Sequence, residues 1–174
     1  MVVTNAGPLM ALAKVGKLDL LWRLHGQVVL PAAVQEEVVT QGLARRAPDA
    51  PIIRAAIQRG HLAVREVRDA ELPADISGLS LQAGEKQTLY LALREQASLV
   101  LLDDQSARDA AEGRGLRVKG TLGVLRDACR DGLLTLPEVQ QAIGVVIARS
   151  DIWIAESLCL RVLSELESAS ADQA

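Results

Sequence analysis

The chain has 174 residues, of which 49% are hydrophobic and 24% are charged, and its net charge is −3. This balance predicts one globular domain with a sizeable core and argues against disorder, and it is not the strongly basic balance of a dedicated nucleic-acid-binding protein. No apolar stretch reaches the ~20 residues that span a bilayer and no leader pattern opens the chain, so we expect a cytoplasmic protein with no membrane partner.

Short β-rich runs alternate with helical patterns along the chain. The expected strands are residues 2–4, 27–30, 62–67, 98–102 and 116–119. The expected helices are residues 8–15, 18–25, 31–41, 50–59, 83–96, 105–114 and 121–130, followed by two closing helices at about 137–148 and 151–166. Strands that alternate with helices indicate an α/β fold, in which a mostly parallel sheet carries helices on both faces.

Cysteine and histidine are too scarce to build a zinc site or a histidine-based catalytic triad. Cys129 and Cys159 are single and far apart, and we expect both to be reduced thiols. His25 is expected at a helix end beside Gly26, and His61 lies far from it in the sequence. Any catalysis is therefore expected to depend on oxygen ligands.

Polar side chains follow several of the expected strands or begin the helices next to them. In chain order they are Asn5, Glu37, Glu85, Asp103, Asp104 and Thr121. Because ligands of open α/β sheets bind outside the carboxyl ends of the strands, we expect these side chains to converge in one cleft. Carboxylates gathered without a basic residue repel one another unless a hard divalent cation is present, and Mg²⁺ or Mn²⁺ suits such a set.

The helical wheel distinguishes Glu37 from its neighbour Glu36. Val34 and Val38 form the inward apolar stripe of the helix expected over residues 31–41. Glu37 lies beside that stripe, whereas Glu36 points to solvent. We therefore expect Glu37, and not Glu36, to belong to the cleft.

Each acid also has a purely structural interpretation. Asp103 or Asp104 could cap the helix that follows, and Asp104 could pair with Arg108 one turn later. Glu85 could satisfy the free amides of its own helix start, and Glu37 could be an ordinary boundary residue.

The two uncharged members of the set have structural alternatives as well. Asn5 could be a turn residue before Pro8, and Thr121 could be a plain N-cap. The hypothesis of a functional site therefore depends on the joint placement of these residues and not on any one of them.

Four segments resemble, in order and spacing, the PIN-like domains, and they are most similar to a branch related to VapC-type toxins. The segments are VVTNAGPLMALAKVGKLDLL, LPAAVQEEVV, GEKQTLYLAL and LVLLDDQSARDAAEGRGLRVKGTLGVL. The resemblance implies a three-layer α/β/α domain with a mostly parallel central sheet over residues 1–130. Helices over residues 131–166 would pack on that domain or on a partner, and residues 167–174 would form a disordered tail.

The same resemblance implies a Mg²⁺- or Mn²⁺-dependent endoribonuclease of toxin type. The implied catalytic acids are Glu37, Glu85, Asp103 and Asp104. The implied metal ligands are Asn5, Glu85 and Asp103, with Glu37 as a further ligand or as a group that positions water. The expected substrate-binding residues are Thr121, which matches a small hydroxyl residue near the cluster, and Arg108.

Two departures from the family pattern favour an alternative function. Asn5 stands where the family has an aspartate, and Gly7 stands where a serine or threonine is common. The alternative is a degenerate PIN-like module that binds RNA or a protein without cleaving it. A small phosphate- or nucleotide-binding regulator ranks below both, because the chain has no glycine-rich phosphate loop motif.

The expected partners are RNA, a second copy of the chain and a cognate antitoxin. RNA binding would depend on local basic residues such as Arg108, and the chain has only three aromatic residues, so base-stacking platforms are not expected. Apolar residues of the last segment, Trp153 among them, fall on more than one helical face. We therefore expect this segment to be buried in the core or against another chain.

Overall fold

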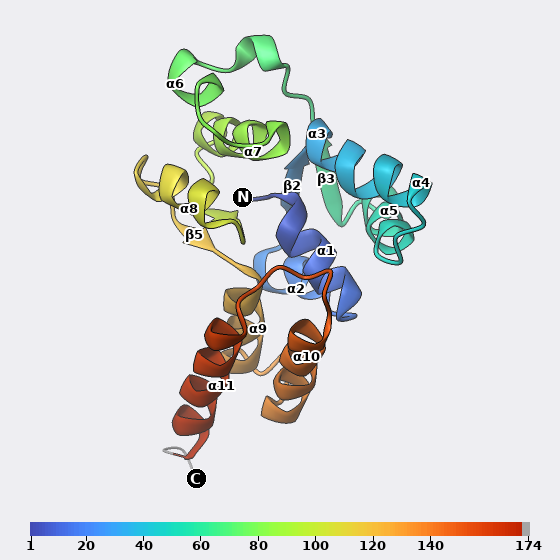
Figure 1. Ribbon diagram of the computed structural model, residues 1–174, viewed down its shortest axis with the longest axis vertical. Helices are drawn as coiled ribbons and strands as arrows, with labels where there is room; N and C mark the ends of the chain where they lie inside the picture. Colours follow the sequence, from blue (N-terminus) through green and yellow to red (C-terminus); the bar gives the residue numbers. More distant parts are fainter. Residues whose placement is uncertain (172–174) are drawn as a thin grey trace.

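The computed structural model describes residues 1–171 as a five-stranded α/β domain (Figure 1). The strands are β1 (Val2–Thr4), β2 (Val28–Pro31), β3 (Leu62–Arg65), β4 (Leu99–Leu101) and β5 (Val118–Lys119). All pairs are parallel and the strand order is β3-β2-β1-β4-β5. The predicted strands and the parallel sheet are therefore confirmed, and the order reverses between β1 and β4, where ligands of such sheets bind.

Helices connect and cover the strands. The first are α1 (Ala6–Lys14), α2 (Leu20–His25), α3 (Ala32–Gln35), the π-helical segment η1 (Glu36–Gln41), α4 (Gly42–Ala44) and α5 (Ala50–Gln58). Next come the 3₁₀ turn η2 (Asp69–Glu71), α6 (Ala74–Ser77), α7 (Ala83–Arg94) and α8 (Gln105–Glu112). The last are α9 (Thr121–Arg130), α10 (Leu136–Ala148) and α11 (Glu156–Ala171). The continuous helix expected over residues 31–41 is wrong in one respect, because its second half is π-helical.

Successive strand residues point to opposite faces of the sheet, and this alternation builds two cores. Val2 and Val28 belong to a core shared with α1, α2, α5 and α9, whereas Val3 and Val29 belong to one shared with α7 and α8. Figure 1 shows α7 and α8 on one side of the strands and α2 and α9 on the other. The predicted three-layer α/β/α architecture is confirmed.

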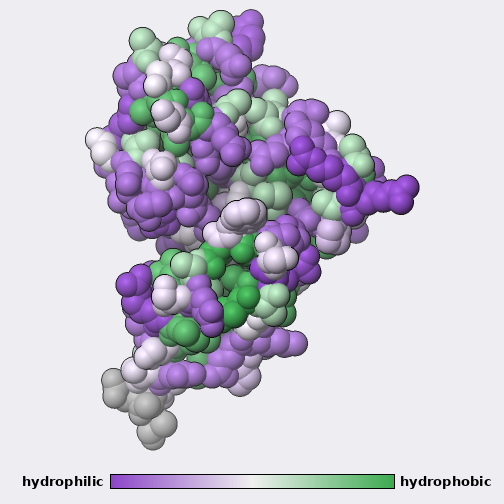
Figure 2. Space-filling view, in the orientation of Figure 1, coloured by the Kyte–Doolittle hydropathy of each residue, from purple (hydrophilic) through white to green (hydrophobic). Residues whose placement is uncertain are grey.

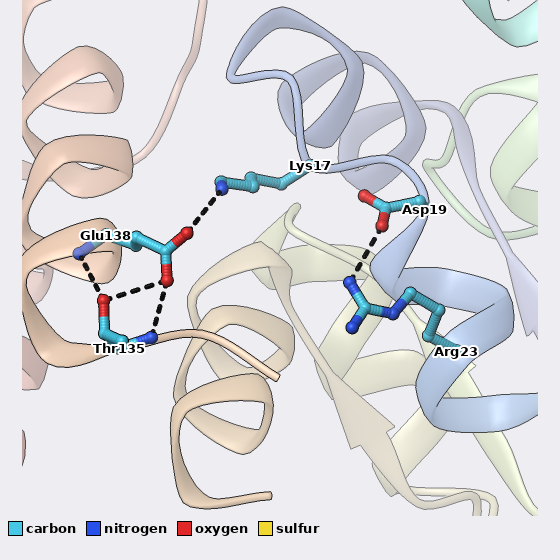
Figure 3. Close-up of polar contacts among 5 residues, drawn as sticks. All are labelled: Lys17, Asp19, Arg23, Thr135 and Glu138. Carbon is cyan, nitrogen blue, oxygen red and sulfur yellow. Dashed lines mark hydrogen bonds and ion pairs between the residues drawn. The ribbon is translucent and has the colours of Figure 1, made fainter. Parts of the chain in front are cut away.

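The helices α10 and α11 pack on the first of these cores. Val139, Ile143 and Cys159 are fully buried there. At the start of α10 the Glu138 carboxylate accepts hydrogen bonds from the Thr135 amide and hydroxyl and lies 3.8 Å from Lys17 Nζ (Figure 3). This contact joins the C-terminal helices to the turn between α1 and α2.

Two expectations for the C-terminal segment need correction. Helix α11 begins at Glu156, not at 151, because residues 151–155 form an irregular connection in which Asp151 pairs with Lys14 and Arg149. The tail expected to be disordered from 167 is helical as far as Ala171, and residues 172–174 lie outside the described residues.

The structure agrees with the predictions that the two cysteines are unpaired and that His25 lies at a helix end. Cys129 and Cys159 are free thiols. His25 ends α2, and Gly26 follows it with a φ of 68°, a left-handed conformation that glycine adopts without strain. Within residues 1–171, none of the helices combines the length and apolar character that a bilayer crossing requires.

Candidate active site

A cleft lies at the carboxyl ends of β1 and β4, where the strand order reverses. Its volume is about 460 Å³. The predicted site residues that line it are Asn5, Glu37, Glu85, Asp103 and Asp104. The structure thus brings together all five residues that were expected to bind metal or to act as catalytic acids, and we call this space the acidic cleft.

Asn5 contributes a buried oxygen atom that lacks a hydrogen-bond partner. The residue directly follows β1, precedes α1 as its N-cap and is 8% exposed. Its side chain makes no capping hydrogen bond, and within residues 1–171 no group donates to its Oδ1 atom. The turn interpretation is therefore wrong. A buried acceptor without a donor costs about 1–3 kcal/mol, so this oxygen favours a hydrogen-bond donor or a cation.

Glu37 enters the cleft from the π-helical segment η1, a rare backbone form that is frequent at functional sites. Its carboxyl group is partly buried, whereas the Glu36 side chain is exposed, which confirms the helical-wheel distinction. Burial raises the pKa of Glu37, and the nearby negative charge of Glu85 raises it further. The binding of either a proton or a cation stabilises such a carboxyl group.

Gly84 makes room for both Asn5 and Glu37. A Cβ atom at position 84 would lie 3.5 Å from Asn5 Oδ1, 3.5 Å from Glu37 Oε2 and 3.3 Å from a methyl group of Val34. The two oxygen atoms therefore face the same small space, which exists because residue 84 has no side chain.

Glu85 satisfies the start of its helix and also lies in the cleft. It lies in the first turn of α7, and its Oε2 accepts a hydrogen bond of 2.9 Å from the Gln82 amide, so it does satisfy the helix start. It also lines the acidic cleft. Burial raises the pKa of Glu85 and the charge of Asp104 adds to this, while the Gln82 amide acts in the opposite direction.

The adjacent aspartates after β4 have different environments. Asp104 is exposed and caps α8 through a 2.9 Å hydrogen bond from the Ala107 amide to its Oδ1. Asp103 is partly buried; Oδ1 accepts from the Thr121 amide at 2.7 Å and Oδ2 accepts from the Thr121 hydroxyl at 2.6 Å. Burial raises the pKa of Asp103, against the effect of these two bonds and of the Arg108 charge. The fold therefore holds both carboxylate oxygens of Asp103.

Thr121 and Arg108 lie behind Asp103 and do not line the acidic cleft. Thr121 is fully buried as the first residue of α9, and Gly120 is the N-cap, so the N-cap interpretation of Thr121 is wrong by one position. Arg108 donates to the Leu102 carbonyl at 3.1 Å and lies 3.9 Å from Glu112. Its ion pair is thus with Glu112 and not with Asp104.

Two glycines that sequence reasoning did not select in this role approach Asp103 closely. A Cβ atom at Gly120 would lie 2.7 Å from Asp103 Oδ1, closer than real Cβ atoms come to such an oxygen. A Cβ atom at Gly7 would lie 3.4 Å from Asp103 Oδ2, so the serine or threonine common at this position would bring a hydroxyl group to that carboxylate. Only the folded geometry shows these approaches.

The oxygen donors of the cleft fit one kind of cation site better than another. Within residues 1–171, no three histidine, cysteine or acidic side chains lie close enough to form a ligand cluster by themselves. The cleft nevertheless has carboxylates and an amide oxygen without a partner, and Mg²⁺ typically binds through one or two carboxylates and keeps several waters. The residues therefore fit a hard, largely hydrated divalent cation better than a fully protein-coordinated one.

The connection between α10 and α11 forms one wall of the cleft, which the sequence did not predict. Its contribution comes from Asp151, Ile152, Trp153 and Ile154. Trp153 is 92% exposed, so the expectation that this ring is buried in the protein's own core is wrong. Nothing in a helical-wheel pattern could have shown this, because the residue does not lie in a helix.

Comparison with protein families agrees with the fold. The model of DUF3368, described as a PIN domain, matches residues 1–168. The chain belongs to this PIN-domain family. The match spans α10 and most of α11, so the C-terminal helices are part of the family's domain and not an addition to it. Comparisons with curated proteins and with solved structures found no match.

Proposed function

We propose that this PIN domain is a Mg²⁺- or Mn²⁺-dependent endoribonuclease of toxin type. The observation that carries the proposal is the buried Oδ1 atom of Asn5, which has no partner among the described residues and belongs to a residue that lines the acidic cleft. A divalent cation would supply the missing interaction, and it would relieve the repulsion by which Glu85 raises the pKa of Glu37 and Asp104 raises the pKa of Glu85.

The residues of the acidic cleft would have different roles, because their environments differ. Asn5, Glu85 and Asp103 would hold the cation, which when bound polarises a phosphate oxygen and acidifies water. Thr121 keeps Asp103 oriented through two hydrogen bonds. Glu37, with its pKa raised by burial, can accept a proton from an attacking water or orient that water toward the phosphorus.

A second candidate function is a PIN module that binds RNA or protein without cleaving it. It is favoured by the neutral amide at Asn5 and by the lack of a three-acid cluster within residues 1–171. The two candidates differ in one measurable property, the cleavage of a phosphodiester bond.

The test is cleavage of a mixed-sequence RNA in Mg²⁺, in Mn²⁺ and in EDTA. The wild-type protein should cleave in either metal and not in EDTA, Asp103→Asn should lose cleavage, and the matched control Glu36→Gln, outside the cleft, should keep it. Equal cleavage in EDTA, or equal cleavage by Asp103→Asn, would indicate a contaminating nuclease or another site. No cleavage in either metal, with RNA still bound, would favour the second candidate.

A further inference from the structure

Trp153 is exposed to solvent, although the chain on either side of it is fixed. Its side chain is 92% exposed. Two residues earlier, the Asp151 carboxylate accepts hydrogen bonds of 2.8 and 2.9 Å from Arg149, and the Asp151 carbonyl accepts one of 2.9 Å from Lys14 on α1. The next residue, Ile152, is buried in the core. A fixed segment thus presents a free indole ring.

The ring lies between two hollows of the surface. Trp153 and Ile154 line the acidic cleft, and they also line a second cavity of about 460 Å³. Asp103 lines both hollows as well. The connection that carries Trp153 runs between α10 and α11 and arches toward α1, on the face where Figure 2 shows hydrophobic residues gathered over α9, α10 and α11. A ligand that extends from one hollow into the other would pass the indole.

The second cavity is rich in positive charge. Its basic lining residues are Arg108, Lys119, Arg126 and Arg161, and among residues 1–171 its one acidic lining residue is Asp103. We call this surface the cationic groove. Its place beside the acidic cleft puts groups that attract phosphates next to groups that suit a cation.

The partners of these basic residues show which of them can bind a ligand. Lys119 is paired with Asp127, and Arg126 lies 3.8 Å from Glu165. Arg161 is exposed and has no ion-pair partner within residues 1–171. Arg161 is therefore the basic residue of the groove that is most available to a phosphate.

We propose that single-stranded RNA crosses from the cationic groove into the acidic cleft with one base stacked on Trp153. A positively charged groove next to an aromatic ring is the usual combination in proteins that bind single strands, and stacking needs no particular base. The sequence expectation of no stacking platform depended on the number of aromatic residues and not on where one of them lies. This inference rests on the proposed function and adds a residue that positions the substrate.

The first test measures stacking without cleavage. The chain has two tryptophans, so Trp22→Phe leaves Trp153 as the only indole, and Trp153→Phe leaves Trp22 as a matched control. Each protein is titrated in EDTA with an eight-nucleotide oligouridylate and with an abasic oligomer of the same length. Trp153 emission should be quenched by oligouridylate and much less by the abasic oligomer, and Trp22 emission should not change with either.

The second test measures the energetic contribution. Trp153→Ala should bind the oligouridylate at least about fivefold more weakly, since stacking on one aromatic ring is typically worth that factor or more, and Trp153→Phe should recover most of the loss. Because the ring is exposed, Trp153→Ala should leave the melting temperature unchanged. Arg161→Gln should reduce the slope of log affinity against log salt by about 0.7, the value for one phosphate contact on a single strand.

Three kinds of outcome overturn the inference, and a further one overturns only the proposed function. RNA binding without quenching of Trp153, or no RNA binding at all, would show that the indole is not a stacking platform. A change of oligomeric state in Trp153→Ala with unchanged RNA affinity would show that the ring is part of a protein interface. Stacking without cleavage in Mg²⁺ would leave the inference intact and contradict the proposed ribonuclease. Cleavage with a normal KM in Trp153→Ala would contradict the inference and leave the proposed ribonuclease intact.

Discussion

Two cavities of nearly equal volume show what distinguishes a candidate site from an ordinary hollow. The acidic cleft has a volume of about 460 Å³, and a cavity between α2 and α5 has about 480 Å³. In the cavity between α2 and α5, Trp22 stacks on His61, with ring centroids 4.4 Å apart and planes at 7°. The wall of this cavity is mostly apolar. Among residues 1–171, none of the side chains with a buried oxygen or nitrogen that lacks a partner lines it.

The acidic cleft differs from the α2–α5 cavity in its polar groups. It has the free Oδ1 atom of Asn5 and three carboxyl groups, those of Glu37, Glu85 and Asp103, whose pKa values are raised by burial. Such groups destabilise the ligand-free fold, so the cleft should respond to metal while the α2–α5 cavity should not. Cavity volume alone would rank the two the wrong way round.

The largest effect is expected from Thr121→Val, which removes the hydroxyl that holds Asp103 Oδ2. Groups that orient a metal ligand typically change metal affinity or activity by about 10–100-fold, and we expect a loss in that range. Isothermal titration with Mn²⁺ and the cleavage rate would measure it. Thr40→Val, at an exposed threonine of η1, is the matched control. Equal losses in both variants would mean that the threonine acts through stability alone.

Restoring the acid by Asn5→Asp should have the next largest effect. A carboxylate adds a negative charge to the cleft, so metal affinity should rise about tenfold, while the melting temperature in EDTA should fall. The two signs together are the prediction. A variant that is neutral in both conditions would place Asn5 outside the metal site, and one stabilised in both would show that the cleft lacks the expected repulsion.

Gly84→Ala should weaken the metal response several-fold, because the new methyl group would occupy the space between Asn5 Oδ1 and Glu37 Oε2. Gly144→Ala is the control: position 144 lies in α10 with open space around it. That control should gain roughly 0.5–1 kcal/mol of stability and keep the metal response. The response would be measured as the metal-induced shift of the melting temperature, and an unchanged shift in Gly84→Ala would contradict the assignment.

The smallest effect concerns pH. The pKa of Glu37 is raised above 4.5, so between that value and its folded pKa the native carboxyl binds more protons than the unfolded one, and the free energy of unfolding falls as pH rises. In EDTA, Glu37→Gln should therefore become more stable relative to wild type as pH increases through this window. Asp151, whose pKa is lowered to about 2 by Arg149 and Lys14, acts in the opposite direction in both proteins and cancels. A difference that does not vary with pH would contradict the raised pKa.

The sequence was sufficient for the sheet and for most of the acidic cleft. Asn5, Asp103 and Asp104 follow strands, and the carboxyl ends of parallel strands meet at one edge, so their convergence follows from topology alone. The separation of Glu37 from Glu36 followed from helical periodicity and held even though the backbone there is π-helical.

The features that sequence reasoning missed depend on contacts between distant segments. The closeness of Gly120 to Asp103 joins the β5–α9 turn to the end of β4. Trp153 lies in the connection before α11, where Lys14 of α1 donates a hydrogen bond to the Asp151 carbonyl. Neither contact has a local pattern in the sequence. Homodimerisation and an antitoxin partner stay predictions.

The most direct test of the account is thermal unfolding of the wild-type protein with and without Mg²⁺ or Mn²⁺. A cation at ten times its dissociation constant should add about 1.4 kcal/mol of stability, or about 3–6 °C for a domain of this size. The rise should disappear in Asp103→Asn and persist in His61→Ala, which changes the α2–α5 cavity. A melting temperature that does not respond to millimolar metal, or a response lost in His61→Ala and kept in Asp103→Asn, would contradict the claim that the acidic cleft is a metal site.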